Sequence, residues 1–204
     1  MQRIRSLLVV AALLAMPAAT SAQGPRFTVN FGIGPTLPVG HLGSRIPDGY
    51  NAVVGAGLTL GSTWGLRAEG LYNRFGARNN YAVVCVDGVS CSRRSFVLGG
   101  TLNLERDWRL PFREHRGPGH RGGTAAAYVV GGFGFFSMHA PVVGGATPAG
   151  VYAYENRTRA YTGWNAGGGI RAPLELAFLY VEARVHSLNP TGTQIVPITV
   201  GLVF

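Results

Sequence analysis

Three residue types on which hydrolytic enzymes rely lie close together late in the chain: Glu182, His186 and Ser187. A serine that a histidine activates, and that an acid helps to orient, attacks ester and amide bonds. The segment around them alternates in polarity like a β-strand, and adjacent residues of a strand point to opposite faces. His186 and Ser187 therefore diverge, so we predict no catalytic residue. A hydrolase that uses His186, with Glu182 as its acid, is kept as the alternative.

A second set of residues is suited to electrostatic pairing. Six charged residues stand in segments otherwise rich in apolar residues and glycine: Arg67, Glu69, Glu105, Arg171, Glu182 and Arg184. An isolated charge in an interior is costly, so acids and bases that share a narrow space should pair. We predict that these six form a structural network of ion pairs that closes the space. A charged constriction in a small pore is the functional alternative.

Both sets depend on strands to position them, and the chain contains eight segments with alternating or strand-rich composition. Each is about ten residues or slightly longer, the length of a tilted strand that crosses a membrane. Eight strands are the smallest common number for a membrane barrel. We therefore predict an all-β fold, an eight-stranded antiparallel up-and-down transmembrane β-barrel. The segments are Arg26–Val39, Tyr50–Leu60, Gly65–Phe75, Arg93–Arg106, Thr124–Met138, Thr158–Arg171, Leu176–Leu188 and Gln194–Phe204.

The composition agrees with such a barrel. Hydrophobic residues make up 47% of the chain and charged residues only 13%, against about 25% charged in a typical soluble domain. No apolar run after the N-terminal region is long enough for a membrane helix. In Leu176–Leu188, for example, Leu179 and Val181 share one face while Glu182 and Arg184 share the other. The fifth segment is apolar on both faces between Val129 and Phe136, so its register stays unassigned.

The connections between the segments set an orientation. The expected outer connections are 40–49, 76–92, 139–157 and 189–193, and most are long, whereas the inner turns 61–64 and 172–175 are short. The inner connection Asp107–Gly123 is long and basic, which departs from this pattern. Six aromatic residues are candidates for girdles at the two membrane interfaces: Tyr72, Phe96, Trp108, Tyr128, Trp164 and Phe204.

The N-terminal region has the composition of an export signal. Arg3 and Arg5 precede an apolar stretch, and small residues lead to a cleavage site after Ala22. We therefore predict a signal peptide over residues 1–22 and a single barrel domain over residues 23–204. In an exported chain, Cys85 and Cys91 on either side of an Asp-Gly turn are expected to form a disulfide. Free thiols or a metal site are the alternatives, but no histidine lies close in sequence, and we predict neither a metal nor a cofactor.

The last residues carry the strongest resemblance to a known family. Ile198, Val200, Leu202 and Phe204 alternate with Thr199, Gly201 and Val203, and an aromatic residue ends the strand. This stretch, with the preceding LYVEARVHSLN of residues 179–189, resembles the final hairpin of the small OmpA/OmpX-like outer-membrane β-barrels. The resemblance covers Gln23–Phe204. It implies integral location in a bacterial outer membrane, and insertion by the barrel-assembly machinery, which would read the last strand.

The resemblance also frames the function. We predict a non-enzymatic protein, a monomer, that supports envelope integrity or binds partners through its outer loops. All 18 basic residues are arginines spread along the chain, which points to a solvated rim or to lipopolysaccharide phosphate, and not to nucleic acid. The enzymatic alternative is a lipid A-modifying hydrolase that uses His186. A weaker alternative is a soluble, lipocalin-like periplasmic lipid-binding barrel, which would need an apolar lumen and a polar exterior.

Overall fold

Alternation of apolar and small or polar residues gives this chain strands with two different faces, and eight such strands form the molecule. The computed structural model describes residues 26–40, 47–76, 95–110, 124–146 and 152–204. The strands are β1 (Arg26–Val39), β2 (Gly49–Leu60), β3 (Trp64–Phe75), β4 (Ser95–Arg109), β5 (Ala126–Ala146), β6 (Tyr152–Pro173), β7 (Phe178–Asn189) and β8 (Thr193–Val203). Among the described residues, no helix is long and apolar enough to cross a membrane.

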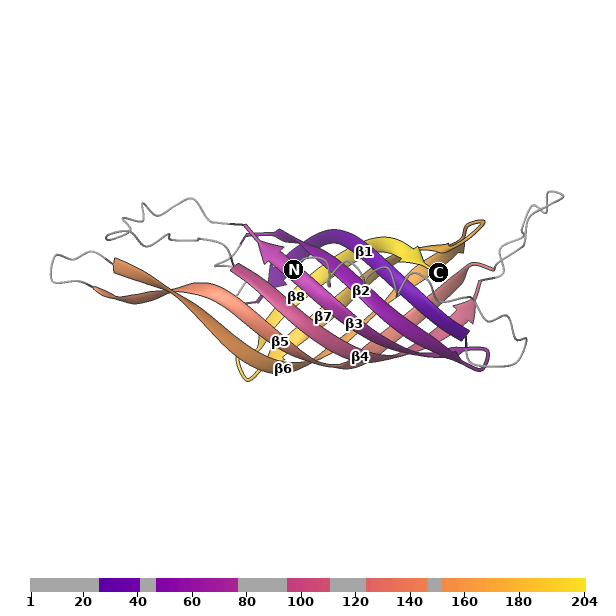
Figure 1. Cartoon of the computed structure of the whole chain (residues 1–204), viewed down its shortest axis with the longest axis horizontal. Coiled ribbons are helices and arrows are strands. Elements are labelled where there is room, and N and C mark those ends of the chain that lie inside the picture. The colour runs from indigo at the N-terminus through magenta and orange to yellow at the C-terminus, as the bar shows by residue number, and fades with distance from the viewer. Residues whose placement is uncertain (1–25, 41–46, 77–94, 111–123, 147–151) are drawn as a thin grey trace, which may run out of the picture.

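Each strand pairs antiparallel with the next along the chain, and β1 pairs with β8 to complete a closed barrel (Figure 1). At this seam Asn30 is the register partner of Val203, and Gly32 is the partner of Gly201. Closure leaves the body of the barrel without a free strand edge, so backbone groups find partners on both sides. The predicted eight-stranded antiparallel barrel is confirmed.

The two faces of the strands divide as the sequence predicts. In β4, Leu98, Leu102 and Leu104 are exposed on the outside, while Thr101 and Asn103 are buried inside. In β7 the exposed residues are Leu179, Val181 and Ala183, and the buried ones are Tyr180, Glu182, Arg184 and His186. The register that the sequence left open in β5 is also settled. Phe133 and Phe135 lie outside, whereas Val130 and Phe136 lie inside.

The two ends of the barrel differ. We call the end that holds Arg26 and Phe204 the terminal end; the turns at 61–63 and 174–177 lie there too, at the right in Figure 1. The opposite end is called the loop end. The two short turns are confirmed, although the second lies two residues later than predicted. The long connection begins three residues later than predicted, because β4 continues through Asp107 and Trp108 to Arg109, and it ends two residues later, because β5 begins at Ala126.

The hairpin of β5 and β6 extends well beyond the other strands at the loop end (Figure 1). β5 pairs with β4 only as far as His139, and β6 pairs with β7 only from Thr162 onward. Beyond these points the two strands pair with each other alone, up to Ala146 and Tyr152. The prediction of an outer connection over 139–157 was therefore wrong for most of its length. A two-stranded ribbon needs no lipid-facing alternation, so the sequence pattern did not mark it.

Candidate functional site

Four charged side chains form a ring across the inside of the barrel. Arg67 and Glu69 come from β3, and Glu182 and Arg184 come from β7, on a different part of the wall. Arg67 contacts Glu69 through Nε at 3.1 Å and Glu182 through Nη2 at 2.6 Å. Arg184 contacts Glu69 through Nη1 at 2.6 Å and pairs with Glu182 through Nη2. Each arginine thus binds both glutamates, and all four residues are buried.

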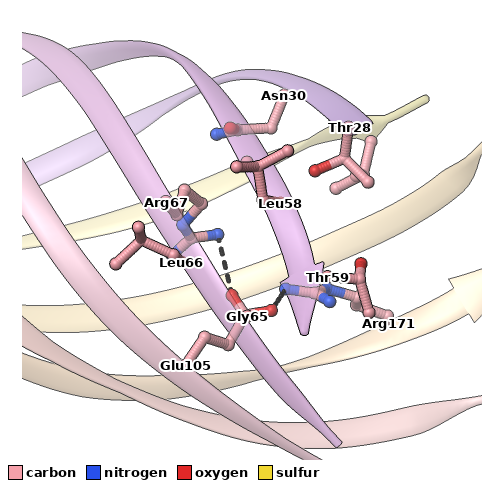
Figure 2. A pocket seen from close by; sticks show the side chains of 11 residues that line it. Thr28, Asn30, Leu58, Thr59, Gly65, Leu66, Arg67, Glu105 and Arg171 are labelled. Atoms are coloured by element: carbon pink, nitrogen blue, oxygen red, sulfur yellow. Dashed lines mark ion pairs between the residues drawn. The ribbon is translucent and has the colours of Figure 1, made fainter. Parts of the chain in front are cut away.

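The ring continues toward the terminal end through β4 and β6. Arg67 Nη1 lies 3.4 Å from Glu105 Oε2, and Glu105 Oε1 lies 2.5 Å from Arg171 Nη2. Figure 2 shows these two ion pairs side by side, with Asn30 and Thr28 of β1 nearby. Arg171 also binds Asp107 at 3.3 Å. The structure thus brings together all six charged residues that the sequence singled out, and adds Asp107.

Tyr128 of β5 supports this network from the side. Its hydroxyl donates to Glu182 Oε2 at 3.0 Å. Its ring lies 4.3 Å from the Arg171 guanidinium and 5.8 Å from that of Arg67, so it also contributes cation–π attraction. The prediction that Tyr128 belongs to an interface girdle was wrong. It occupies an inward position of β5, where a phenol can hold the charged layer in place.

A layer of amides borders the charged layer, and sequence reasoning missed it. Asn103 Nδ2 donates to Glu69 Oε2 at 2.9 Å, and Asn165 Nδ2 donates to Asn103 Oδ1 at 2.8 Å. Asn30 Nδ2 reaches the other Glu69 oxygen at 3.1 Å. These amide groups donate to lone pairs of Glu69 that the arginines do not use. A buried carboxylate needs such additional hydrogen bonds. Strand alternation places Asn103, two residues before Glu105, on the inward face, but it does not reveal the contact with Glu69.

At the loop end the interior becomes apolar. Six buried side chains pack there into one cluster: Leu71, Phe75, Val97, Phe136, Leu188 and Ile195. Sequence reasoning singled out the charged residues of the interior and did not identify this apolar cluster. Each of these residues falls on the inward parity of its strand, and together they come from five strands, β3, β4, β5, β7 and β8.

Small cavities lie beside the charged network in the described part of the barrel. A cavity of about 30 Å³ lies beside Arg67, Glu105 and Arg171, which Figure 2 shows from close by. A second, of about 20 Å³, lies beside Glu182, Arg184 and His186. Each has room for about one or two water molecules. Neither is large enough for a sugar or an acyl chain.

The candidate hydrolytic residues are not assembled. Glu182 is bound to Arg67, Arg184 and Tyr128. His186 packs edge-on against Phe136, with ring centroids 5.8 Å apart, and its Nδ1 has no hydrogen-bond partner. Ser187 pairs in register with Trp164 and Gln194, one step out of phase with His186. In the described part of the chain, no group of three His, Cys, Asp or Glu residues is placed to hold a metal ion.

The residues of the proposed assembly signal lie along the outer face of β8. Val200 and Phe204 are exposed, and Ile198 and Leu202 are half-buried. The Phe204 backbone exchanges hydrogen bonds with Val29, at 2.9 and 3.0 Å, and its ring stacks on Phe31 at 5.7 Å. Cys85, Cys91 and the cleavage site at Ala22 lie outside the described residues.

Aromatic side chains lie on the outer surface at both ends of the barrel. At the loop end, Tyr50, Tyr72, Phe96 and His139 contact one another in a row across β2 to β5, with successive centroids 6.4, 5.9 and 4.9 Å apart. His139 was expected in a loop, but it lies in β5, where it stacks on Phe96. At the terminal end, Trp64 and Trp108 are exposed on adjacent strands.

Solved structures with a similar fold support this architecture. No protein-family model matches the chain, and no curated protein sequence does. Neisserial surface protein A, NspA, aligns with a TM-score of 0.55 at 14% identity, over 87% of this chain and 95% of that one. Ail, the attachment invasion locus protein of Yersinia pestis, solved with the heparin analogue sucrose octasulfate, aligns with a TM-score of 0.51 at 13% identity, over 89% and 99%. At such identities the likeness shows a shared fold, the closed eight-stranded barrel.

Proposed function

We propose that this chain is a non-enzymatic integral protein of a bacterial outer membrane. The observation that carries the proposal is the apolar outer wall of a closed barrel. Large apolar residues are exposed on every strand of that wall, including Ile33 at 70%, Phe133 at 76% and Phe135 at 77%. Soluble proteins rarely expose a contiguous apolar surface of this extent. A closed barrel is also one of the two structures that satisfy every backbone group within a bilayer.

The interior argues against a soluble lipid-binding barrel. Such a protein would need an apolar cavity large enough for an acyl chain and a polar exterior. Here the two cavities beside the charged network are about 30 and 20 Å³, charged residues line both, and the outer wall is apolar. The polarity of the two faces is the reverse of what a lipocalin-like protein requires.

The same interior favours a non-enzymatic role over a lipid A-modifying hydrolase. A triad needs an acid that is available to orient the histidine. Glu182 already accepts from Arg67, Arg184 and Tyr128, and His186 faces the apolar cluster through Phe136. The charged layer and the apolar cluster lie one after the other along the barrel axis, and both occupy its interior. This arrangement favours a structural closure over a conducting pore.

We further propose that the protein acts at the cell surface through the β5–β6 hairpin, in addition to any support that it gives the envelope. The hairpin stands clear of the barrel at the loop end, and Arg157 and Arg159 are exposed on it. Ail, which shares the fold, was solved with a sulfated heparin analogue. An exposed pair of arginines is suited to such sulfate groups, because the planar guanidinium fork can donate two hydrogen bonds to two oxygens of one anionic group.

The proposal includes the orientation of the barrel in the outer membrane and its route of insertion. The terminal end faces the periplasm, the loop end faces outward toward lipopolysaccharide, and the barrel-assembly machinery inserts the chain. The barrel functions as a monomer, because its closed seam leaves no strand edge for a second copy along its body.

Two measurements test location and barrel stability. Membranes of an expressing bacterium are separated by density, and the outer-membrane fraction is run on a denaturing gel with and without boiling. We expect the protein in the outer-membrane fraction, with a mobility that changes on boiling. A protein that stays in the aqueous periplasm, with no change in mobility, would overturn the proposal and favour the lipocalin-like alternative.

A third measurement tests the surface role. The refolded parent and the variant R157Q/R159Q are compared for retention on immobilised heparin, with R26Q as a control at the terminal end. We expect the double variant to elute at lower salt than both the parent and the control. Equal elution of all three proteins would remove the hairpin arginines from the proposal while leaving the outer-membrane location intact.

A further inference from the structure

An arginine on the outer wall lies against two tryptophans at the terminal end. The Arg106 guanidinium is 5.2 Å from the centre of the Trp64 ring and 5.5 Å from that of Trp108. Trp64 is the register partner of Arg106 on β3, and Trp108 follows it by two residues on β4. All three side chains therefore share the outer face. Two cation–π contacts hold the planar guanidinium in a restricted set of orientations.

The hydrogen-bonding capacity of this arginine is not used within the protein. In the part of the chain that the structure describes, Arg106 makes the two cation–π contacts, but it makes no ion pair and no hydrogen bond through its side chain. The neighbouring acid, Asp107, faces the other way and pairs with Arg171 inside the barrel. The outer wall at this point thus carries positive charge that no acid of the described residues neutralises.

Arg106 lies at the edge of the apolar outer wall, as its neighbours on β3 and β4 show. Leu66 and Leu104 are register partners and stand one step closer to the middle of the barrel, and both are exposed. Beyond Arg106 toward the terminal end come Trp108 and then the last residue of β4. The arginine therefore marks the edge of the apolar wall, the level at which tryptophan rings prefer the interface between acyl chains and headgroups.

We propose that Arg106, held by Trp64 and Trp108, is a binding site for the phosphate diester of a glycerophospholipid in the membrane leaflet at the terminal end. This inference rests on the proposed outer-membrane location. The stacked guanidinium presents its free N–H groups to the phosphate oxygens, an arrangement that favours paired hydrogen bonds. The adjacent leucines and indole rings contact the glycerol and upper acyl carbons. A free phosphate ion would lack that second set of contacts.

The loop end offers a matched contrast. Arg74 also lies over an aromatic ring, that of Tyr50, at 5.9 Å, and it too belongs to the outer face. Its Nη1 donates to the Tyr50 hydroxyl at 3.1 Å, so part of its donor set is already used within the protein. A single ring also holds it less firmly than two. Arg74 therefore serves as a control for a stacked surface arginine that is not committed to phospholipid.

The test uses the full barrel refolded in detergent and examined by native mass spectrometry with added lipid. The probes are dioleoyl phosphatidylglycerol and dioleoylglycerol, which share acyl chains but differ in the phosphate. We expect the parent to retain phosphatidylglycerol in preference to dioleoylglycerol. R106Q should lower that retention about fivefold, because one interfacial arginine contributes roughly this factor. R106K should lie between them, since an ammonium keeps the charge but not the planar stacking, and R74Q should match the parent.

The outcomes separate this inference from the proposed function. Each variant is first inserted into phospholipid vesicles, and its gel mobility is compared with and without boiling. If all proteins insert and R106Q retains phosphatidylglycerol as the parent does, the phosphate site is overturned while the membrane barrel stands. Equal retention of dioleoylglycerol and phosphatidylglycerol, or displacement of the lipid by inorganic phosphate, would also overturn it. Failure of the parent to insert would overturn both proposals.

Discussion

Arg67 and Glu182 meet inside the barrel at 2.6 Å, Nη2 to Oε2, although they are 115 residues apart in the chain. The pair ties β3 to β7 across the interior. Hydrogen bonds within the wall join each strand only to its two neighbours. The charged ring thus connects parts of the wall that the backbone cannot connect, and it gives a first prediction for stability.

Replacing Arg67 with methionine should strongly destabilise the barrel. The substitution leaves Glu69, Glu182 and Glu105 without a shared partner in a buried space, and an uncompensated buried charge costs about 3–5 kcal/mol. Urea unfolding in lipid vesicles, followed by tryptophan fluorescence, measures the change in unfolding free energy. R159Q, which alters an exposed arginine, is the control and should unfold like the parent. Unchanged unfolding of variants at Arg67, Glu69, Glu182 and Arg184 alike would contradict the structural closure.

The apolar cluster at the loop end predicts a different response from adjacent residues. Phe136→Ala removes a ring that is 2% exposed and should cost about 3–5 kcal/mol of unfolding free energy. Phe135→Ala removes a ring that is 77% exposed on the outer wall, so its cost should be clearly smaller. Both variants are measured by unfolding in the same detergent. Equal costs would show that the cluster does not pack as a core.

Two neighbouring glycines of β4 provide a further comparison. A Cβ at Gly99 would come within 2.6 Å of the Phe136 ring, whereas the nearest atom to a Cβ at Gly100 is 3.9 Å away. Gly99→Ala should therefore cost about 1–3 kcal/mol through overpacking. Gly100→Ala should be neutral or stabilise the barrel by up to about 1 kcal/mol, because alanine restricts the unfolded chain. Thermal unfolding of the two variants and the parent measures these differences in stability. A Gly99→Ala variant more stable than Gly100→Ala would contradict the packing at Phe136.

A charge placed on the outer wall tests the membrane directly. Leu102 is 56% exposed in the middle part of β4, and Leu102→Arg should reduce the folding free energy in vesicles by about 2–4 kcal/mol. Leu176, 88% exposed in the turn at the terminal end, is the control, and Leu176→Arg should cost no more than about 1 kcal/mol. If Leu102→Arg folds as well as the parent, the wall does not face hydrocarbon.

Sequence reasoning predicted the strands of the barrel body closely, because a wall between lipid and a packed interior imposes strict alternation. β1 has the predicted bounds, and β7 and β8 differ from theirs by one or two residues. The prediction was least accurate for β5 and β6, whose outer parts pair only with each other. In β5 the pattern was also ambiguous because the interior is apolar at that height. Phe136 packs inside while Phe135 packs outside, so apolar residues occupy both parities.

The composition of the interior was harder to predict than its location. Parity and opposite charge predicted that Glu69 and Arg184 face inward and join a network of ion pairs, but not that they bind each other. Which residues meet across a barrel depends on the stagger of the strands, and that stagger is set by pairing around the whole circumference. For the same reason the layers of charge, amide and apolar side chains were not separated from the sequence. The contact of Arg106 with two tryptophans was also not predicted. Trp108 is close to Arg106 in sequence, but Trp64 is distant and reaches it only through the pairing of β3 with β4.

The seam between β1 and β8 has a consequence for how the molecule forms. It joins the first described strand to the last, so nearly the whole chain lies between Asn30 and its partner Val203. Contacts between residues this distant in sequence slow folding, because a long segment loses conformational entropy before the stabilising contacts form. Until β8 arrives, β1 presents an unpaired edge that is open to association with other chains. The early strands therefore need protection until β8 pairs with β1, and the time before closure is when the protein is most vulnerable to aggregation.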